Sequence, residues 1–197
     1  MLLKKIKKAQ LAHKYVLTGG PGVGKTSLLK KLHERGFYVI PEVATTIIEQ
    51  TLKQGLPNPA HGANVAAFQD QIWATQLNLE SELPENEVAF LDRGLLDNLA
   101  YYELHGITPP PDLCVAAQAI NYKTVFLLDF PATFQATAVR RESLQLAHRL
   151  HAIITAKYQA FGYSIINIPA FSHNASGNTM SVHESIAMRA DFVCSYM

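Results

Sequence analysis

One short stretch near the start of the chain has the residue types and spacing of a phosphate-binding loop. It fits the pattern G-x-x-x-x-G-K-[ST] without a substitution. In such a loop the backbone N–H groups point into one concavity, and the next helix adds the positive end of its dipole. The stretch therefore predicts nucleotide binding. The residues expected to bind are Gly19, Gly20, Pro21, Gly22, Val23, Gly24, Lys25, Thr26 and Ser27.

Two side chains of this loop have expected roles of their own. Lys25 is expected to reach the β- and γ-phosphates, and the hydroxyl of Thr26 is expected to bind Mg²⁺. The alternative is a glycine-rich turn that matches by chance. The context disfavours it, because a short apolar strand is expected at residues 15–17 and an amphipathic helix at residues 27–35. The predicted cofactors are Mg²⁺ and ATP, with GTP left open.

Two acidic residues follow short apolar runs, where buried strands are expected to end. Asp92 follows residues 88–91 and is predicted to hold Mg²⁺, directly or through water, although it could instead cap the next helix. Glu42 closely follows residues 37–40. An acid there can take a proton from an attacking hydroxyl, although many such acids only cap a helix. Arg93 could pair with phosphate or with Glu42, or form a surface salt bridge.

A pair of adjacent arginines lies in a long helical pattern. Arg140 and Arg141 are expected in a lid at about residues 131–150 that closes over the phosphates, unless they belong to an ordinary solvated helix. His148 and His151 are one helical turn apart, but no third ligand accompanies them, so the sequence does not predict a metal site there.

A third cluster is suited to recognising a substrate. Gln69 and Asp70 lie on an expected helix that faces the strand ends, and they could read the hydrogen-bonding edge of a base. Phe68 or Trp73 would then stack on it. On these residues alone, aromatic core residues with exposed polar neighbours explain the pattern slightly better.

The remaining patterns predict the elements that must position these side chains. Strands are expected at residues 15–17, 37–40, 88–91, 124–128 and 164–168, and helices at 27–35, 43–54, 63–83, 95–105, 132–161 and 182–194. Short apolar strands that alternate with helices form a parallel doubly wound sheet, in which ligands bind beyond the carboxyl ends of the strands. The fold class is thus α/β, a three-layer P-loop NTPase with a five-stranded parallel sheet and a helical lid. Four polar residues fall at the strand ends: Thr18, Glu42, Asp92 and Asp129.

The bulk composition narrows the class of protein. A chain of 197 residues, 48% hydrophobic and 17% charged, suits one globular domain over residues 1–197. The net charge of +1 gives no reason to expect nucleic acid or an acidic membrane as a partner. The lysines at positions 4, 5, 7 and 8 are interpreted as a solvated N-terminal turn.

The cysteines and the apolar runs indicate a compartment. Cys114 and Cys194 lack metal-ligand spacing and are expected to be free thiols in a reducing environment. No apolar stretch reaches the roughly 20 residues that a membrane span needs. A cytoplasmic location is therefore expected.

The ordered set of motifs resembles a known family along essentially the whole chain. After the P-loop these motifs are Pro41-Glu42-Val43-Ala44, Phe68-Gln69, Phe90-Leu91-Asp92-Arg93-Gly94, Tyr101, Arg140-Arg141-Glu142-Ser143, Tyr158 and Arg189. They resemble the AAA-labelled P-loop ATPase/kinase-like domains, which include the kinase domain of bifunctional nicotinamide riboside kinase proteins. Members often have an Asp a few residues before the lid arginine, where this chain has Ala136, Thr137 and Ala138.

A more distant similarity is to deoxyribonucleoside kinases. In that family a Glu after the second strand acts as base, a Phe-Gln helix reads the nucleobase, and an acid-Arg-small triplet follows the third strand. The resemblance implies the same role for Glu42 as base. The expected catalytic residues are Lys25, Glu42, Asp92, Arg93, Arg140 and Arg141, and the expected substrate-binding residues are Glu42, Phe68, Gln69, Arg93 and Asp97.

Two functions remain open at this point. The first is a kinase that transfers the γ-phosphoryl group of ATP to a hydroxyl of a small, nucleoside-like substrate. The second is a regulatory NTPase that binds ATP or GTP and controls a partner, although Asn-Lys-x-Asp is absent and Asp92-Arg93-Gly94 is not Asp-x-x-Gly. A DNA-handling motor fits poorly, because neither a basic patch nor an oligomeric arginine finger is evident. A homodimer is left open.

Overall fold

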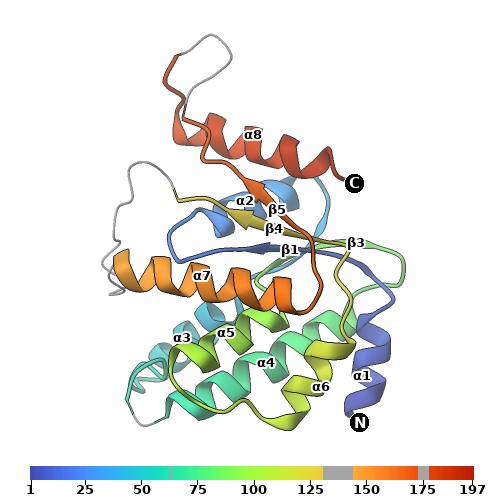
Figure 1. The fold of residues 1–197 in the computed structure, drawn as a ribbon, viewed down its shortest axis with the longest axis vertical. Helices are drawn as coiled ribbons and strands as arrows, with labels where there is room; N and C mark the ends of the chain where they lie inside the picture. The colour runs from blue at the N-terminus through green and yellow to red at the C-terminus, as the bar shows by residue number, and fades with distance from the viewer. Residues whose placement is uncertain (63, 131–143, 173–177) are drawn as a thin grey trace.

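A parallel β-sheet lies between two layers of helices (Figure 1). The structure is a computed structural model and describes residues 1–62, 64–130, 144–172 and 178–197. The strands lie in the order β2-β3-β1-β4-β5, and every pairing is parallel. Their bounds are β1 His13–Thr18, β2 Tyr38–Ile40, β3 Val88–Asp92, β4 Thr124–Leu128 and β5 Ile165–Ile168. The predicted α/β fold with a five-stranded parallel sheet is confirmed.

Helices cover both faces of the sheet. Helices α2 (Lys25–Glu34) and α8 (Val182–Cys194) lie on one face (Figure 1). The other face carries α1 (Leu2–Ala9), α4 (Val65–Glu82), α5 (Leu95–Leu104), α6 (Pro111–Ala119) and α7 (Leu144–Ala160). Helix α3 (Val43–Lys53) packs against α4 through its own small apolar cluster. In the part of the chain that the structure describes, no helix is both long and apolar enough to cross a bilayer.

The central strand β1 is covered by helices on both faces of the sheet. Its successive side chains point to opposite faces, so each enters a different core. Val16 belongs to the core shared with α1, α5 and α7, whereas Leu17 belongs to the core shared with α2 and α8. Neither side chain has exposed surface. Burial on both faces explains why residues 15–17 of this strand are all apolar instead of alternating with polar residues.

The strand order places the predicted site residues at one edge of the sheet. The chain passes from β1 to β2 on one side, and β4 then pairs with β1 on the other side. Such a switch point leaves a crevice beyond the carboxyl ends of the strands. Thr18 and Asp92 end β1 and β3, Asp129 directly follows β4, and Glu42 is the second residue after β2.

Two helices were not anticipated from the sequence. The lysine-rich start forms α1 and is not a turn, because Ile6 and Ala9 bury one face against the core while Lys4, Lys7 and Lys8 stay exposed. The proline loop ends where α6 begins, since Pro111 occupies the first helical turn, which requires no backbone N–H there. The helix predicted over 132–161 is confirmed for α7, and residues 131–143 lie outside the described residues.

Candidate active site

Backbone geometry makes the glycines of the P-loop necessary. Gly22 and Gly24 have φ angles of 80° and 92°, which side chains rarely adopt. A Cβ on Gly20 would lie 2.5 Å from a ring carbon of Phe130, so there is no room for one. The loop ends at Gly24, and α2 begins at Lys25 with its N-terminus directed at the loop. This arrangement suits an anion.

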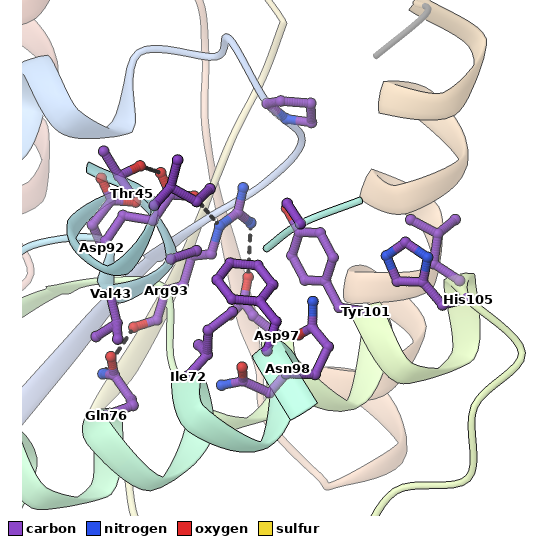
Figure 2. A pocket seen from close by; sticks show the side chains of 18 of the residues that line it. Val43, Thr45, Ile72, Gln76, Asp92, Arg93, Asp97, Asn98, Tyr101 and His105 are labelled. Atoms are coloured by element: carbon purple, nitrogen blue, oxygen red, sulfur yellow. Dashed lines mark hydrogen bonds and ion pairs between the residues drawn. The ribbon is translucent and has the colours of Figure 1, made fainter. Parts of the chain in front are cut away.

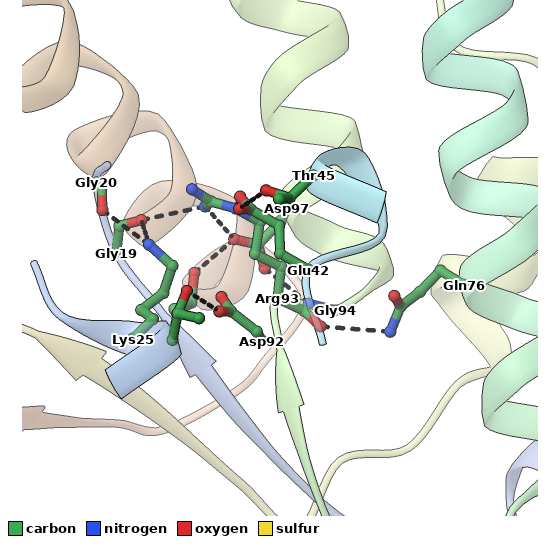
Figure 3. Close-up of polar contacts among 12 residues, drawn as sticks. Gly19, Gly20, Lys25, Glu42, Thr45, Gln76, Asp92, Arg93, Gly94 and Asp97 are labelled. Carbon is green, nitrogen blue, oxygen red and sulfur yellow. Dashed lines mark hydrogen bonds and ion pairs between the residues drawn. The ribbon is translucent and has the colours of Figure 1, made fainter. Parts of the chain in front are cut away.

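The P-loop lysine folds back over its own loop. Lys25 is 4% exposed, and its Nζ donates hydrogen bonds to the carbonyl oxygens of Gly20 at 2.9 Å and Gly19 at 3.3 Å (Figure 3). On the other side of the loop, the backbone N–H of Gly20 donates to Nδ1 of His151 at 3.2 Å. Helix α7 is thereby tied to the phosphate-binding loop.

The two predicted metal ligands lie next to each other. The Thr26 hydroxyl donates to Oδ2 of Asp92 at 2.8 Å, and Asp92 is 1% exposed. Burial raises the pKa of Asp92, and the charge of Lys25 opposes this shift. The other oxygen, Oδ1, is buried without a hydrogen-bond partner in the described ranges. A hydroxyl and a carboxylate with a free oxygen are hard ligands that fit Mg²⁺.

Arg93 lies at the centre of the site and is not on the surface. Its Nε donates to Oε1 of Glu42 at 2.8 Å, and its Nη1 donates to Asp97 Oδ1 at 3.2 Å and Gly19 O at 3.1 Å (Figure 3). The guanidinium is buried. Burial opposes its charge, but Tyr101, Glu42 and Asp97 together raise the pKa of Arg93 above its ordinary value. Of the two pairings open from the sequence, the one with Glu42 is present.

The carboxylate of Glu42 is held at both oxygens. Arg93 donates to Oε1, and the Thr45 hydroxyl donates to Oε2 at 2.7 Å. Glu42 precedes α3, but its side chain makes no capping hydrogen bond to that helix. It also lines the cavity described below and is 8% exposed. A charged carboxylate fixed in this way can accept a proton from a hydroxyl brought to it.

Asp97 joins several elements of the site. Its carboxylate accepts hydrogen bonds from Thr18 Oγ1, Tyr158 OH, Arg93 Nη1 and Gly94 N at 2.6, 2.7, 3.2 and 3.0 Å. It is 1% exposed. These donors occupy the carboxylate, so Asp97 lies in the expected site but is already fully hydrogen-bonded.

A cavity of about 300 Å³ opens beside the P-loop and borders these charged residues. Figure 2 shows side chains of α4 and α5 pointing into it. Its walls include Phe68 and Gln69, for which the sequence predicts substrate binding, and also Asn98 and Tyr101. The Oε1 of Gln69 is buried without a hydrogen-bond partner among the residues described. A small planar molecule with hydrogen-bonding groups fits such a cavity.

Other predicted residues lie elsewhere. Trp73 and Asp70 do not line this cavity, because Asp70 accepts hydrogen bonds from Tyr102 and Trp73 on another side of α4. Arg140 and Arg141 lie outside the described residues, as does most of the expected lid. Within the described ranges, no cluster of three metal-ligating side chains is present.

Sequence reasoning missed two supporting residues. Thr45 binds Glu42, and the only available signal was its position one helical turn after that residue. Asn98 lines the cavity immediately after Asp97 in the sequence. Neither residue carries charge or stands out by type, so no motif indicated them.

The P-loop, the acid at the tip of β3 and the sheet order together define a P-loop kinase-like fold. Residues 14–175 match the family described as "AAA domain". The chain belongs to this family, as the ordered motifs suggested. A search of curated proteins by sequence returned no match.

Solved structures share the fold at low sequence identity. The NadR protein in complex with NR superposes with a TM-score of 0.65 at 14% identity, over 98% of this chain. The chain spans about half the length of that protein, 53%. Thymidylate kinase from Ehrlichia chaffeensis gives 0.59 at 11% identity, covering 93% of this chain and 97% of that one. Deoxyadenosine kinase from M. mycoides gives 0.57 at 14%, covering 93% and 100%.

Proposed function

We propose that this protein is an ATP- and Mg²⁺-dependent kinase that phosphorylates a hydroxyl of a nucleoside-like substrate. One observation carries the proposal. Asp92 Oδ1 and Arg93 Nη2 are buried polar atoms without partners in the described ranges, and both residues lie between the P-loop and the cavity. Buried polar groups are normally hydrogen-bonded, so two such atoms of opposite polarity indicate a missing ligand. A metal-bound phosphoryl group supplies both kinds of partner.

The donor half of the proposed site consists of the P-loop and the residues beside it. The loop amides and Lys25 would hold the phosphates of ATP, with Lys25 exchanging its present bonds to Gly19 and Gly20 for phosphate oxygens. Thr26 and Asp92 would hold Mg²⁺, which when bound supplies charge that stabilises the transferring phosphoryl group. Arg140 and Arg141 remain proposed lid residues on sequence grounds.

The acceptor half consists of Glu42 and the cavity. Glu42 would accept the proton of the attacking hydroxyl while Arg93 keeps its carboxylate charged and oriented. Phe68 would contact the flat face of the substrate, and the free amide oxygen of Gln69 would accept a hydrogen bond from its edge. Asp97 is also among the residues proposed to bind the substrate. Because its carboxylate is already hydrogen-bonded, its proposed contribution is to hold Arg93 in position.

The charge of the described cavity lining favours an acceptor without a phosphate group. Three carboxylates line it, those of Glu42, Asp92 and Asp97, and the one arginine among these described lining residues is already paired with two of them. These carboxylates would repel a phosphate group on the acceptor. Among the structural relatives, NadR was solved with NR, which agrees with a nucleoside acceptor, whereas the deoxyadenosine kinase was solved with the products dCMP and a flexible dCDP.

The alternative is a regulatory NTPase that hydrolyses ATP or GTP and signals to a partner. The P-loop and Asp92 would serve that function equally well. The cavity beside them is the feature that this alternative leaves without a role.

The test is a panel of acceptors with ATP and Mg²⁺. We expect phosphorylation of a neutral or cationic nucleoside and none of nucleoside monophosphates, measured by mass spectrometry of the products. Glu42→Gln should keep the affinity for ATP and lose at least about 100-fold in kcat, as general-base removal does. Glu85→Gln, at an exposed acid, is the matched control and should leave both unchanged. Full activity of Glu42→Gln would show that Glu42 is not the general base. ATP hydrolysis without any phosphorylated acceptor would favour the regulatory NTPase.

A further inference from the structure

Two opposite charges are completely buried beneath the active site. Lys14 on β1 and Glu80 on α4 are each 0% exposed, and Nζ of Lys14 lies 2.6 Å from Oε2 of Glu80. Replacing a buried ion pair with apolar side chains is often neutral for stability or even favourable, so stability alone does not explain such a pair. Burial lowers the pKa of Lys14, and the charge of Glu80 opposes this effect. The pair therefore calls for a role beyond stability.

The second oxygen of Glu80 binds two further side chains. Gln76 Nε2 donates to Oε1 at 3.0 Å, and the hydroxyl of Tyr122 donates to the same oxygen at 3.1 Å. Lys14 also lies over the ring of Tyr122, with Nζ 4.9 Å from its centroid. One carboxylate thus contacts three polar side chains, from β1, from α4 and from the segment between α6 and β4.

Both of these side chains reach the turn that carries Arg93. Gln76 Nε2 also donates to the carbonyl oxygen of Arg93 at 3.4 Å, as Figure 3 shows. The Tyr122 hydroxyl accepts the backbone N–H of Leu95 at 2.9 Å. Between them, the N–H of Gly94 donates to Asp97. The backbone of this turn is therefore held on each of its three residues.

The turn needs this support because its conformation is unfavourable. Arg93 has a φ of 75°, a left-handed value that is uncommon for a residue with a side chain. A Cβ on Gly94 would lie 2.9 Å from the Tyr122 hydroxyl, so the tyrosine also fills the space against the turn. Such backbone persists where the surroundings over-determine it, and this occurs at functional sites.

We infer that Glu80 is a positioning residue for the phosphoryl-transfer site. Acting through Gln76 and Tyr122, it holds the Arg93 turn so that the guanidinium meets Glu42 and Asp97, and its ion pair with Lys14 holds the Glu80 carboxylate in place. Glu80 itself touches neither Arg93 nor the ligands. The inference rests on the proposed function for its catalytic consequence, and on geometry alone for its structural one.

The experiment compares two double variants that both remove the buried lysine. Lys14→Met with Glu80→Gln keeps an oxygen that accepts from Gln76 and Tyr122, whereas Lys14→Met with Glu80→Leu removes it. Both are checked for folding by their thermal midpoints. The direct readout is the Nε–H signal of Arg93 in nitrogen-edited NMR, identified as the arginine signal missing in Arg93→Gln. The second readout is kcat and KM on the acceptor found with the panel.

We expect the glutamine variant to keep the Arg93 signal and a kcat within about threefold of wild type. The leucine variant should shift or lose that signal and drop kcat at least tenfold, with KM for ATP nearly unchanged. An unchanged Arg93 signal in the folded leucine variant would overturn the inference. If the signal changes as expected but wild type phosphorylates no acceptor, the positioning role stands and the proposed function fails, so the two failures are distinguishable.

Discussion

At the scale of single residues, the P-loop is already engaged by groups of the protein itself. Lys25 donates to two loop carbonyls, and the N–H of Gly20 donates to His151. A phosphate that binds to the loop must replace some of these contacts. Its affinity therefore reflects the difference between the loop's hydrogen bonds to phosphate and its present hydrogen bonds within the protein. His151 is the one of these partners whose charge changes near neutral pH.

Acidification should weaken the contact between His151 and the loop. Burial lowers the pKa of His151 from 6.5; Asp129 opposes this shift, while His148 and Lys25 add to it. Because the folded pKa lies below the unfolded one, the stabilising contribution is present above about pH 6.5 and is lost as pH falls through the folded pKa. We expect His151→Asn to lose less free energy of unfolding than wild type between pH 7.5 and pH 5, measured by urea denaturation. His61→Asn, at an exposed histidine, is the control and should follow wild type.

The residues of the site were predictable where a motif fixes them. The P-loop sequence implies its geometry, and an acid after an apolar strand implies the position of Asp92, so both predictions followed from local pattern. The pairing of Arg93 with Glu42 was not decidable, because it depends on the left-handed backbone at Arg93 and on the approach of β2 to β3. The positions of Thr45 and Asn98 in the site could not be predicted for a similar reason, because they depend only on neighbours in the folded structure.

At the scale of elements, α8 is attached to the P-loop through one buried arginine. Arg189 donates to the carbonyl oxygens of Val23 at 2.6 Å, Pro169 at 3.1 Å and Asp129 at 3.2 Å. It is 5% exposed, and burial lowers its pKa. These three carbonyls belong to the P-loop and to the segments after β4 and β5, so one side chain joins the ends of three strands.

Replacing Arg189 should lower the free energy of unfolding far more than replacing Arg35, a surface arginine that also contacts α8. Arg189→Met leaves three carbonyls to be resolvated or left unpaired, and an unpaired buried group costs roughly 1–3 kcal/mol, so we expect a loss of about 3 kcal/mol or more. Arg35→Met breaks an exposed pair with Asp191 and should cost less than about 1 kcal/mol. Chemical denaturation of both variants measures the difference. Equal losses would show that Arg189 does not anchor the loop.

The elements themselves were predicted well where hydrophobic periodicity was strong. Helix α8 and strand β4 have the bounds that the sequence indicated. The two helices that the sequence did not predict, α1 and α6, are short. Their apolar faces pack against the core, but α1 contains four lysines and α6 begins with a proline. Packing, which a local pattern does not contain, decides such segments.

At the scale of the whole molecule, ligand binding should be visible as global stabilisation. Mg²⁺ with ATP at 100 times its Kd would add about 2.7 kcal/mol and raise the melting temperature by about 5–10 °C in a chain of this size. We expect EDTA to reduce this shift and Lys25→Ala to abolish it, with Lys30→Ala as the exposed control on the same helix. Differential scanning fluorimetry with ATP and GTP in parallel also shows which nucleotide is preferred. A full shift in Lys25→Ala would contradict the assigned role of the loop.

The outer strands of the sheet have a consequence for self-association. Strand β2 has three residues and is followed by Pro41, which has no N–H to donate, and β5 at the opposite edge has four. Short edges interrupted by proline offer little template for pairing with a second sheet. We therefore expect concentrated solutions of this protein to resist growth of intermolecular β-structure through these edges.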